Sequence, residues 1–103
     1  MIKVSVFYPQ TEDSHFDMNY YLDVHMPMVE ERLGSSLKMV SVEEGITGAA
    51  PGSQPSYAAM GHLYFDSVDD FQRAFGPHAD VILCDIPNYT NVRPNIQVSK
   101  VRR

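Results

Sequence analysis

The amino-acid sequence predicts one α+β domain over residues 1–103, with strands and helices in the order β-α-β-β-α-β. Residues 1–8 and 57–65 alternate between two faces as β-strands do, whereas residues 16–33 and 67–84 repeat apolar side chains at helical spacing. This order is typical of the ferredoxin-like arrangement, an antiparallel sheet with both helices on one face. A chain of 103 residues is long enough to bury a core of its own.

The first strand, residues 1–8, is followed by a polar turn and then by the first helix, residues 16–33. One face of the strand carries Ile2, Val4, Val6 and Tyr8. The apolar stripe of the helix consists of Met18, Leu22, Val29 and Leu33. Spacings of four, seven and four residues place these side chains on one helical face.

A histidine interrupts that apolar stripe. His25 follows Leu22 by three residues and precedes Val29 by four, and Tyr21 lies one helical turn before it. The helix therefore presents an imidazole and a phenol to the surface on which it packs.

Three residues predict how this helix begins, bends and ends. Asp17 suits the N-cap and Gly34 suits the position after the last turn. Pro27 has no amide hydrogen, so it removes one helical hydrogen bond and bends the chain. We expect the bend two residues after His25, with a backbone carbonyl left free beside the ring.

The second strand is predicted over residues 37–46 and the third over residues 57–65, with a loop rich in Gly, Pro and Ser at residues 47–56. One face of the third strand carries Tyr57, Ala59, Gly61, Leu63 and Phe65, and the other carries Ala58, Met60, His62 and Tyr64. Two helices on one side cover only one of these faces. The pattern therefore predicts a homodimer in which two sheets pack face to face across a two-fold axis.

Ser67 is expected to begin the second helix, with Asp70 completing an imperfect capping box. The inward stripe of this helix is Val68, Phe71 and Phe75. A Gly-Pro pair at residues 76–77 interrupts the helix, which resumes over residues 78–84.

The fourth strand is predicted over residues 91–101, after a turn at residues 85–90. Its two faces carry Val92, Ile96 and Val98 on one side and Arg93, Asn95, Gln97 and Ser99 on the other. Pro94 cannot donate to a ladder, so it indicates an edge or a bulge near the start of the strand.

The charge balance restricts the classes of partner. The formal net charge is −5, with 8 basic and 13 acidic side chains, which argues against nucleic acid and against an anionic membrane surface. No apolar run approaches the roughly 18 residues of a membrane span, and no signal-peptide pattern is visible, so a cytoplasmic location is expected. Cys84 is the only cysteine, and we expect it to be a reduced thiol that helps to fill the core.

The chain resembles the EthD family, named after a protein encoded with the system for ethyl tert-butyl ether degradation. The resemblance runs from Val4 to Val101 and rests on the segments YYLDVHMPMVEERLG, GAAPGSQP, YAAMGHLYFDSVDDFQRAFGPH and DIPNYTNVRPNIQVS. Its most specific parts are Tyr21 with His25-Met26-Pro27, and the Ile86–Thr90 segment.

This resemblance implies a dimeric α+β barrel built from two ferredoxin-like subunits. The wider superfamily includes small isomerases, cyclases, cofactor-free monooxygenases and haem-degrading enzymes. Similar sequences carry the word reductase in their names, but no Gly-rich dinucleotide motif follows any predicted strand here. The resemblance does not identify a substrate.

His25 is the first candidate for chemistry. On the inner face of a helix its imidazole is partly desolvated, so a neutral ring there could act as a general base on an acidic C–H or a phenol. The alternative is a structural histidine, hydrogen-bonded to a buried carbonyl or tyrosine, that holds the helix on the sheet. His25 matches the motif histidine of the family, which strengthens the functional interpretation and leaves both interpretations open.

Substrate-binding candidates come from the third strand and from the aromatic residues. His62, Tyr64 and Met60 share one strand face and either line a pocket between sheet and helices or lie at the dimer interface. Tyrosine hydroxyls can donate to a carbonyl or an enolate; Tyr21 is favoured as a catalytic partner of His25, and Tyr89 is a binding candidate. Core packing with a satisfied polar tip is the competing explanation for each of them.

No metal site is expected, because the four histidines are scattered and neither H-x-x-x-H nor C-x-x-C occurs. Haem, with His25 or His62 as axial ligand, is a less favoured alternative to a site without a cofactor. Cys84 lies in an apolar run without a signal for a reactive thiolate.

These observations lead to one functional hypothesis and two alternatives. The leading hypothesis is a homodimer that binds a small organic molecule such as an ether, lactone or phenol. His25 would be the base of a cofactor-independent proton transfer, isomerisation or oxygenation, with Tyr21 and His62 orienting the substrate. The alternatives are a non-catalytic accessory or binding module of a monooxygenase system, and an interaction protein that assembles through its sheet face into oligomers larger than dimers.

Overall fold

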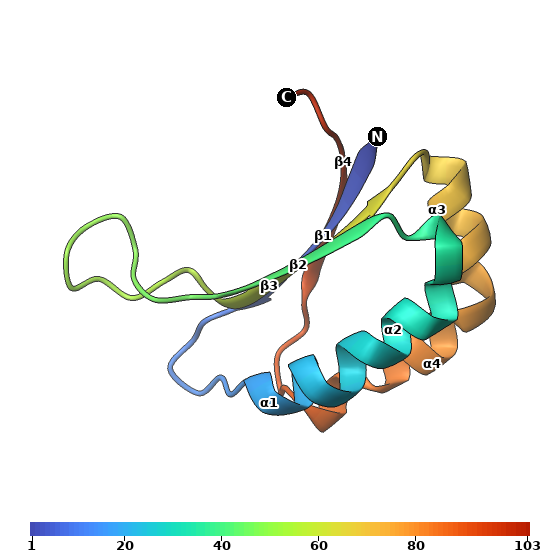
Figure 1. Ribbon diagram of the computed structural model, residues 1–103. Helices are drawn as coiled ribbons and strands as arrows, with labels where there is room; N and C mark the ends of the chain where they lie inside the picture. The colour runs from blue at the N-terminus through green and yellow to red at the C-terminus, as the bar shows by residue number, and fades with distance from the viewer.

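The computed structural model describes residues 1–103 and has the predicted order of elements (Figure 1). The strands are β1 (Ile2–Pro9), β2 (Met39–Glu44), β3 (Tyr57–Phe65) and β4 (Asn95–Lys100). They form one sheet in the order β2-β3-β1-β4, in which every neighbouring pair is antiparallel. The helices are α1 (Met18–Tyr20), α2 (Met26–Leu33), α3 (Val68–Phe75) and α4 (Ala79–Cys84). All of them lie on one side of the sheet, which confirms the ferredoxin-like α+β fold (Figure 1).

A π-helical turn, Tyr21–His25, joins α1 and α2 into one continuous helical segment. The Met26 amide donates to the carbonyl of Tyr21, five residues back, where a regular α-helix would use the residue four back. Pro27 follows directly. Its ring would collide with the carbonyl of the residue four positions earlier in a regular helix, and the wider turn relieves that collision.

The π-turn corrects the predicted apolar stripe of the first helix. One inserted residue rotates the following side chains by about 100° around the helix axis. Leu22, which the regular spacing placed inside, is 47% exposed, whereas Tyr21, His25 and Met26 are buried. The buried residues of the helical segment are therefore Tyr21, His25, Met26, Val29 and Leu33.

Both predicted N-caps are confirmed. The Asp17 carboxylate accepts a hydrogen bond of 3.1 Å from the Tyr20 amide, and the Ser67 hydroxyl accepts one of 3.1 Å from the Asp70 amide. Gly34 ends α2 with a φ of 63°, a conformation that L side chains rarely adopt.

Four details differ from the sequence-based expectation. β4 begins only at Asn95, because Pro94 has no amide to donate to the ladder. β2 is shorter than predicted. Val68 lies in the first turn of α3 and is exposed, so the inward stripe there is Phe71 and Phe75. Cys84 is also exposed and does not fill the core.

The core between helices and sheet is rich in tyrosine. The largest fully buried side chains are Tyr8, Tyr21, Tyr89 and Phe65. A buried phenol needs a hydrogen-bond partner, so three such residues in one core require a polar network.

Every helix is too short or too polar to cross a lipid bilayer.

Candidate functional site

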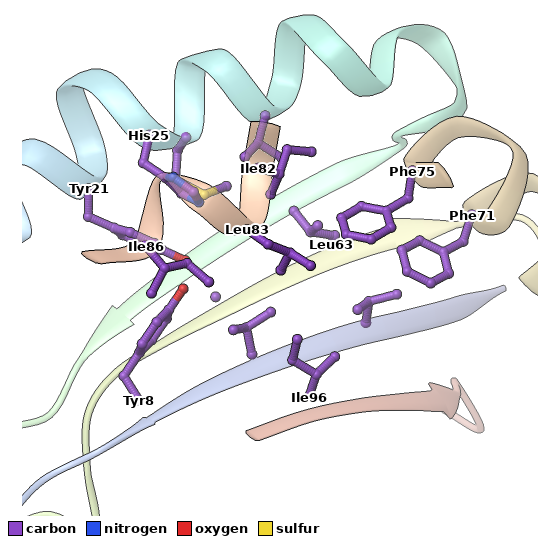
Figure 2. Close-up of a pocket in the computed structure, with 15 residues that line it drawn as sticks. Tyr8, Tyr21, His25, Leu63, Phe71, Phe75, Ile82, Leu83, Ile86 and Ile96 are labelled. Carbon is purple, nitrogen blue, oxygen red and sulfur yellow. The ribbon is translucent and has the colours of Figure 1, made fainter. Parts of the chain in front are cut away.

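A cavity of about 100 Å³ lies between the helices and the sheet. Thirteen of its 15 lining residues are hydrophobic, which makes it suited to a small apolar molecule. Figure 2 shows Tyr21 and His25 reaching down from the helical segment and Tyr8 rising from β1 towards them. The apolar wall consists chiefly of Val4, Val6, Met26, Val29, Leu63, Phe71, Phe75, Ile82, Leu83, Ile86 and Ile96.

His25 is paired with Asp85, a residue just after α4. The two side chains are 2.8 Å apart, from Nδ1 of the imidazole to Oδ2 of the carboxylate. The other carboxylate oxygen, Oδ1, accepts hydrogen bonds from the Tyr20 hydroxyl at 2.7 Å and from the Asn88 amide at 2.9 Å. Asp85 therefore receives donors on both oxygens, an arrangement that stabilises the ionised carboxylate.

The pKa shifts agree with this geometry. Burial raises the pKa of the Asp85 carboxyl, but the hydrogen bonds that it accepts outweigh burial, and its pKa lies below the ordinary value. For His25, burial lowers the pKa more than Asp85 raises it. His25 is consequently neutral at pH 7. Because ionised Asp85 can only accept, the histidine proton lies on Nδ1, and Nε2 keeps its lone pair.

Two phenols contact the ring of His25, and a third, Tyr8, is hydrogen-bonded to one of them. Tyr21 stacks on the imidazole, with ring centroids 5.4 Å apart and an interplanar angle of 15°. The Tyr89 hydroxyl lies 3.4 Å from Nε2 and 2.6 Å from the Tyr8 hydroxyl. Burial raises the pKa of all three phenols well above the ordinary value, so they are neutral donors at any physiological pH.

Gly61 makes room for this cluster on β3. A Cβ at residue 61 would collide with the Tyr21 hydroxyl, which therefore lies directly against the strand backbone. The glycine in the middle of a central strand, normally unfavourable, has a packing reason here.

Known proteins with a similar sequence or fold show to which family this chain is related. A family model described as the EthD domain matches residues 9–92. This chain belongs to the EthD family. An EthD-like protein from Ralstonia eutropha JMP134 is 46% identical, with a TM-score of 0.93 over 99% of this chain and 94% of that one. An EthD family protein from Bacillus halodurans C-125 is 18% identical and has a TM-score of 0.69 over 99% of both chains, a similarity of fold alone. No curated protein matches this chain.

The EthD domain brings some of the predicted site residues together and separates others. His25 and Tyr21 both line the cavity. Tyr89 lies behind them and is fully buried. Met60, His62 and Tyr64 lie on the opposite face of the sheet, because their β3 neighbours Gly61 and Leu63 point into the cavity.

Of the two places expected for His62, the structure gives the sheet face opposite the helices, so His62 does not share the cavity of His25 within one chain. Both nitrogens of His62 have partners on that face. Its Nδ1 is 2.9 Å from the Ser5 hydroxyl, and its Nε2 is 2.8 Å from a Glu43 carboxylate oxygen.

Two members of the site were missed by sequence analysis. The sequence places Asp85 only in a turn and Tyr8 only on the apolar face of the first strand. Asp85 and His25 are 60 residues apart in the sequence, and Tyr8 and Tyr89 are 81 residues apart. Local periodicity therefore cannot predict either contact. The only sequence signal was a carboxylate beside the Ile86–Thr90 segment.

Neither histidine fits haem. The cavity beside His25 is too small for the macrocycle, and Nε2 of that ring faces the Tyr89 hydroxyl. His62 has both nitrogens engaged. The structure contains no cluster of three or more His, Cys, Asp and Glu side chains that could hold a metal ion.

Proposed function

We propose that this EthD domain binds a small, largely apolar organic molecule between its helices and its sheet, and that His25 acts on it as a general base without a bound cofactor. One observation carries the proposal. His25 lines an apolar cavity while Asp85 holds its proton on Nδ1, so that Nε2, which faces the Tyr89 hydroxyl at 3.4 Å, keeps a lone pair that can accept a proton.

The surroundings define the chemistry that the base would serve. Proton removal from a phenol or from the carbon beside a lactone carbonyl leaves an anion, and the phenol of Tyr21 lines the same cavity as a neutral hydrogen-bond donor. The imidazolium formed at His25 is stabilised by the Asp85 carboxylate at 2.8 Å. Such a step begins an isomerisation or an oxygenation of an activated ring.

A second candidate function is a non-catalytic binding or accessory module. It is favoured by the fact that every fully buried polar side-chain atom already has a hydrogen-bond partner within the chain. In that case the His25–Asp85 pair holds the helical segment on the sheet, and the cavity only accommodates a ligand.

The test is a ligand screen by thermal shift on the wild-type protein and His25→Gln, above pH 7, where His25 is neutral. The panel contains phenols and small lactones, including 2-coumaranone. A ligand at about 100 times its dissociation constant adds about 2.7 kcal/mol to the free energy of unfolding. We expect ligands that stabilise the wild-type protein to lose most of this effect in His25→Gln.

His15→Gln serves as the matched control, because His15 is exposed and lies outside the cavity. It should keep the full ligand response. A panel without any stabilising ligand, combined with a large fall in the melting temperature of unliganded His25→Gln, would mean that the histidine is structural.

We also propose that the protein is a homodimer joined through the sheet face opposite the helices. That face carries Phe7, Met60 and Tyr64, all only half-buried in the single chain, and no helix covers it (Figure 1). A second copy would bury these side chains by packing its own sheet against them.

Met60→Asp should therefore convert the protein from twice the chain mass of 11.6 kDa to the chain mass itself, measured by sedimentation equilibrium. A charge in an apolar interface is costly to desolvate, whereas Asp23→Lys on the exposed side of the π-turn should leave the mass unchanged. A wild-type protein that sediments as a single chain at micromolar concentration would refute the dimer.

A further inference from the structure

A continuous chain of hydrogen-bonding groups connects Asp85 to the cavity. Asp85 contacts His25 Nδ1 at 2.8 Å, His25 Nε2 lies 3.4 Å from the Tyr89 hydroxyl, and that hydroxyl lies 2.6 Å from the Tyr8 hydroxyl. Tyr8 lines the cavity, but Tyr89 does not. The lone pair of the base therefore faces a buried phenol, and a second phenol lies between that one and the ligand space.

The direction of each hydrogen bond in this row follows from the ionised Asp85 carboxylate at its end. Ionised Asp85 accepts, so His25 donates through Nδ1 and accepts through Nε2. Tyr89 must then donate its single proton to Nε2, and its oxygen accepts the proton of Tyr8. Every proton in the row points towards the carboxylate, and the oxygen of Tyr8 is the acceptor at the cavity end.

We propose that Tyr8 is the catalytic group that receives the proton of the bound ligand and that Tyr89 relays a proton from Tyr8 to His25. The inference rests on the proposed function and makes its site more specific. Figure 2 shows the hydroxyl of Tyr8 directed from β1 towards the hydroxyl end of Tyr21, beside the cavity.

The transfer is balanced without any other reactant. The ligand C–H or O–H bond breaks and its proton forms a new O–H bond at Tyr8. The former proton of Tyr8 moves to Tyr89, and the former proton of Tyr89 moves to Nε2 of His25. Both phenols end neutral, the ligand is an anion, and His25 is an imidazolium paired with Asp85.

The surroundings favour a concerted shift over a stored phenolate. Burial raises the pKa of Tyr8 and Tyr89, so neither phenol ionises by itself. The 3.4 Å separation between Tyr89 and His25 is long for a hydrogen bond, and catalytic contacts of this kind often tighten only when a ligand is bound. No cationic side chain lines the cavity, so the ligand should enter as a neutral molecule.

Deuterium exchange into 2-coumaranone, a small lactone with acidic ring-methylene protons, tests the relay. The exchange rate in D₂O, saturated with protein, is followed by ¹H NMR of the intact lactone, and its dissociation constant is measured separately. Tyr89→Phe keeps the ring and removes only the relay hydroxyl. We expect a rate about a hundredfold lower with an unchanged dissociation constant, a loss at the lower end of general-base contributions.

Tyr57→Phe is the matched control, because Tyr57 is a half-buried tyrosine of β3 that packs on Phe7 away from the cavity. It should exchange like the wild-type protein. If Tyr89→Phe fails to fold, Tyr8→Phe provides the second variant, and its exchange rate should fall at least as far.

Two different results separate the relay from the proposed base. Wild-type exchange no faster than that of His25→Gln would refute the base and the relay together. A slow His25→Gln combined with a Tyr89→Phe variant as fast as wild type would show that the proton passes directly to His25, which overturns the relay alone.

Discussion

Replacing Asp85 with alanine should lower the free energy of unfolding by about 3 kcal/mol, since hydrogen bonds to a charged group contribute about 1.5–3 kcal/mol each and do not add fully. Three donors lose their acceptor at once: His25 Nδ1, the Tyr20 hydroxyl and the Asn88 amide. For a chain of this size each kcal/mol corresponds to about 4–8 °C in melting temperature.

The measurement is urea unfolding followed by circular dichroism. Asp80→Ala is the matched control, because Asp80 is an exposed carboxylate in the first turn of α4, whose loss should cost less than about 1 kcal/mol. Equal stabilities of the two variants would mean that the hydrogen bonds to Asp85 add nothing measurable to the free energy of unfolding.

The difference in stability between the wild-type protein and Asp85→Ala should also depend on pH. The folded-state pKa of Asp85 lies below its ordinary value of 3.8, so the folded protein binds fewer protons there than the unfolded chain. Its stabilisation is present above that value and is lost as the pH falls through the lower, folded-state pKa. The stability gap between wild type and Asp85→Ala should therefore narrow in acid, while carboxylates common to both proteins cancel.

Gly61→Ala should destabilise the protein by about 3 kcal/mol, the upper end of the usual cost of overpacking. The new Cβ would collide with the Tyr21 hydroxyl, and Tyr21 has little freedom to move. Its ring packs edge-on against Phe16 and Tyr8 and stacks on His25. A displaced Tyr21 would also displace the base, so ligand stabilisation should weaken in the same variant.

Gly76→Ala is the control for this substitution. Gly76 has helical angles, φ −50° and ψ −50°, and nothing lies within 4 Å of an added Cβ. That variant should be neutral or slightly more stable, because alanine restricts the unfolded chain. A Gly61→Ala variant as stable as Gly76→Ala would show that the tyrosine cluster adapts without cost. Thermal unfolding measures both.

Much of the fold could be predicted because it depends on local patterns. Alternation in β1 and β3, the N-caps Asp17 and Ser67, and the helix-ending Gly34 each act within a few residues of chain. Family membership was likewise visible in the sequence and is confirmed by the match over residues 9–92.

The differences have two causes. Pro27 predicts a bend in the helix, but the π-turn before it also shifts the side chains, which leaves Leu22 exposed. For His62 the strand alternation is regular, but it shows only that the two faces differ and not which one the helices cover.

The sequence by itself determined the order of elements, the sheet class, the family and the candidacy of His25 with Tyr21, since spacing and capping are encoded within short stretches. Only the tertiary structure decided which sheet face holds the cavity, and only folding joined His25 to Asp85 and Tyr8 to Tyr89. These hydrogen bonds link residues 60 and 81 positions apart, and such distant groups become neighbours only when the whole sheet and its helices pack together.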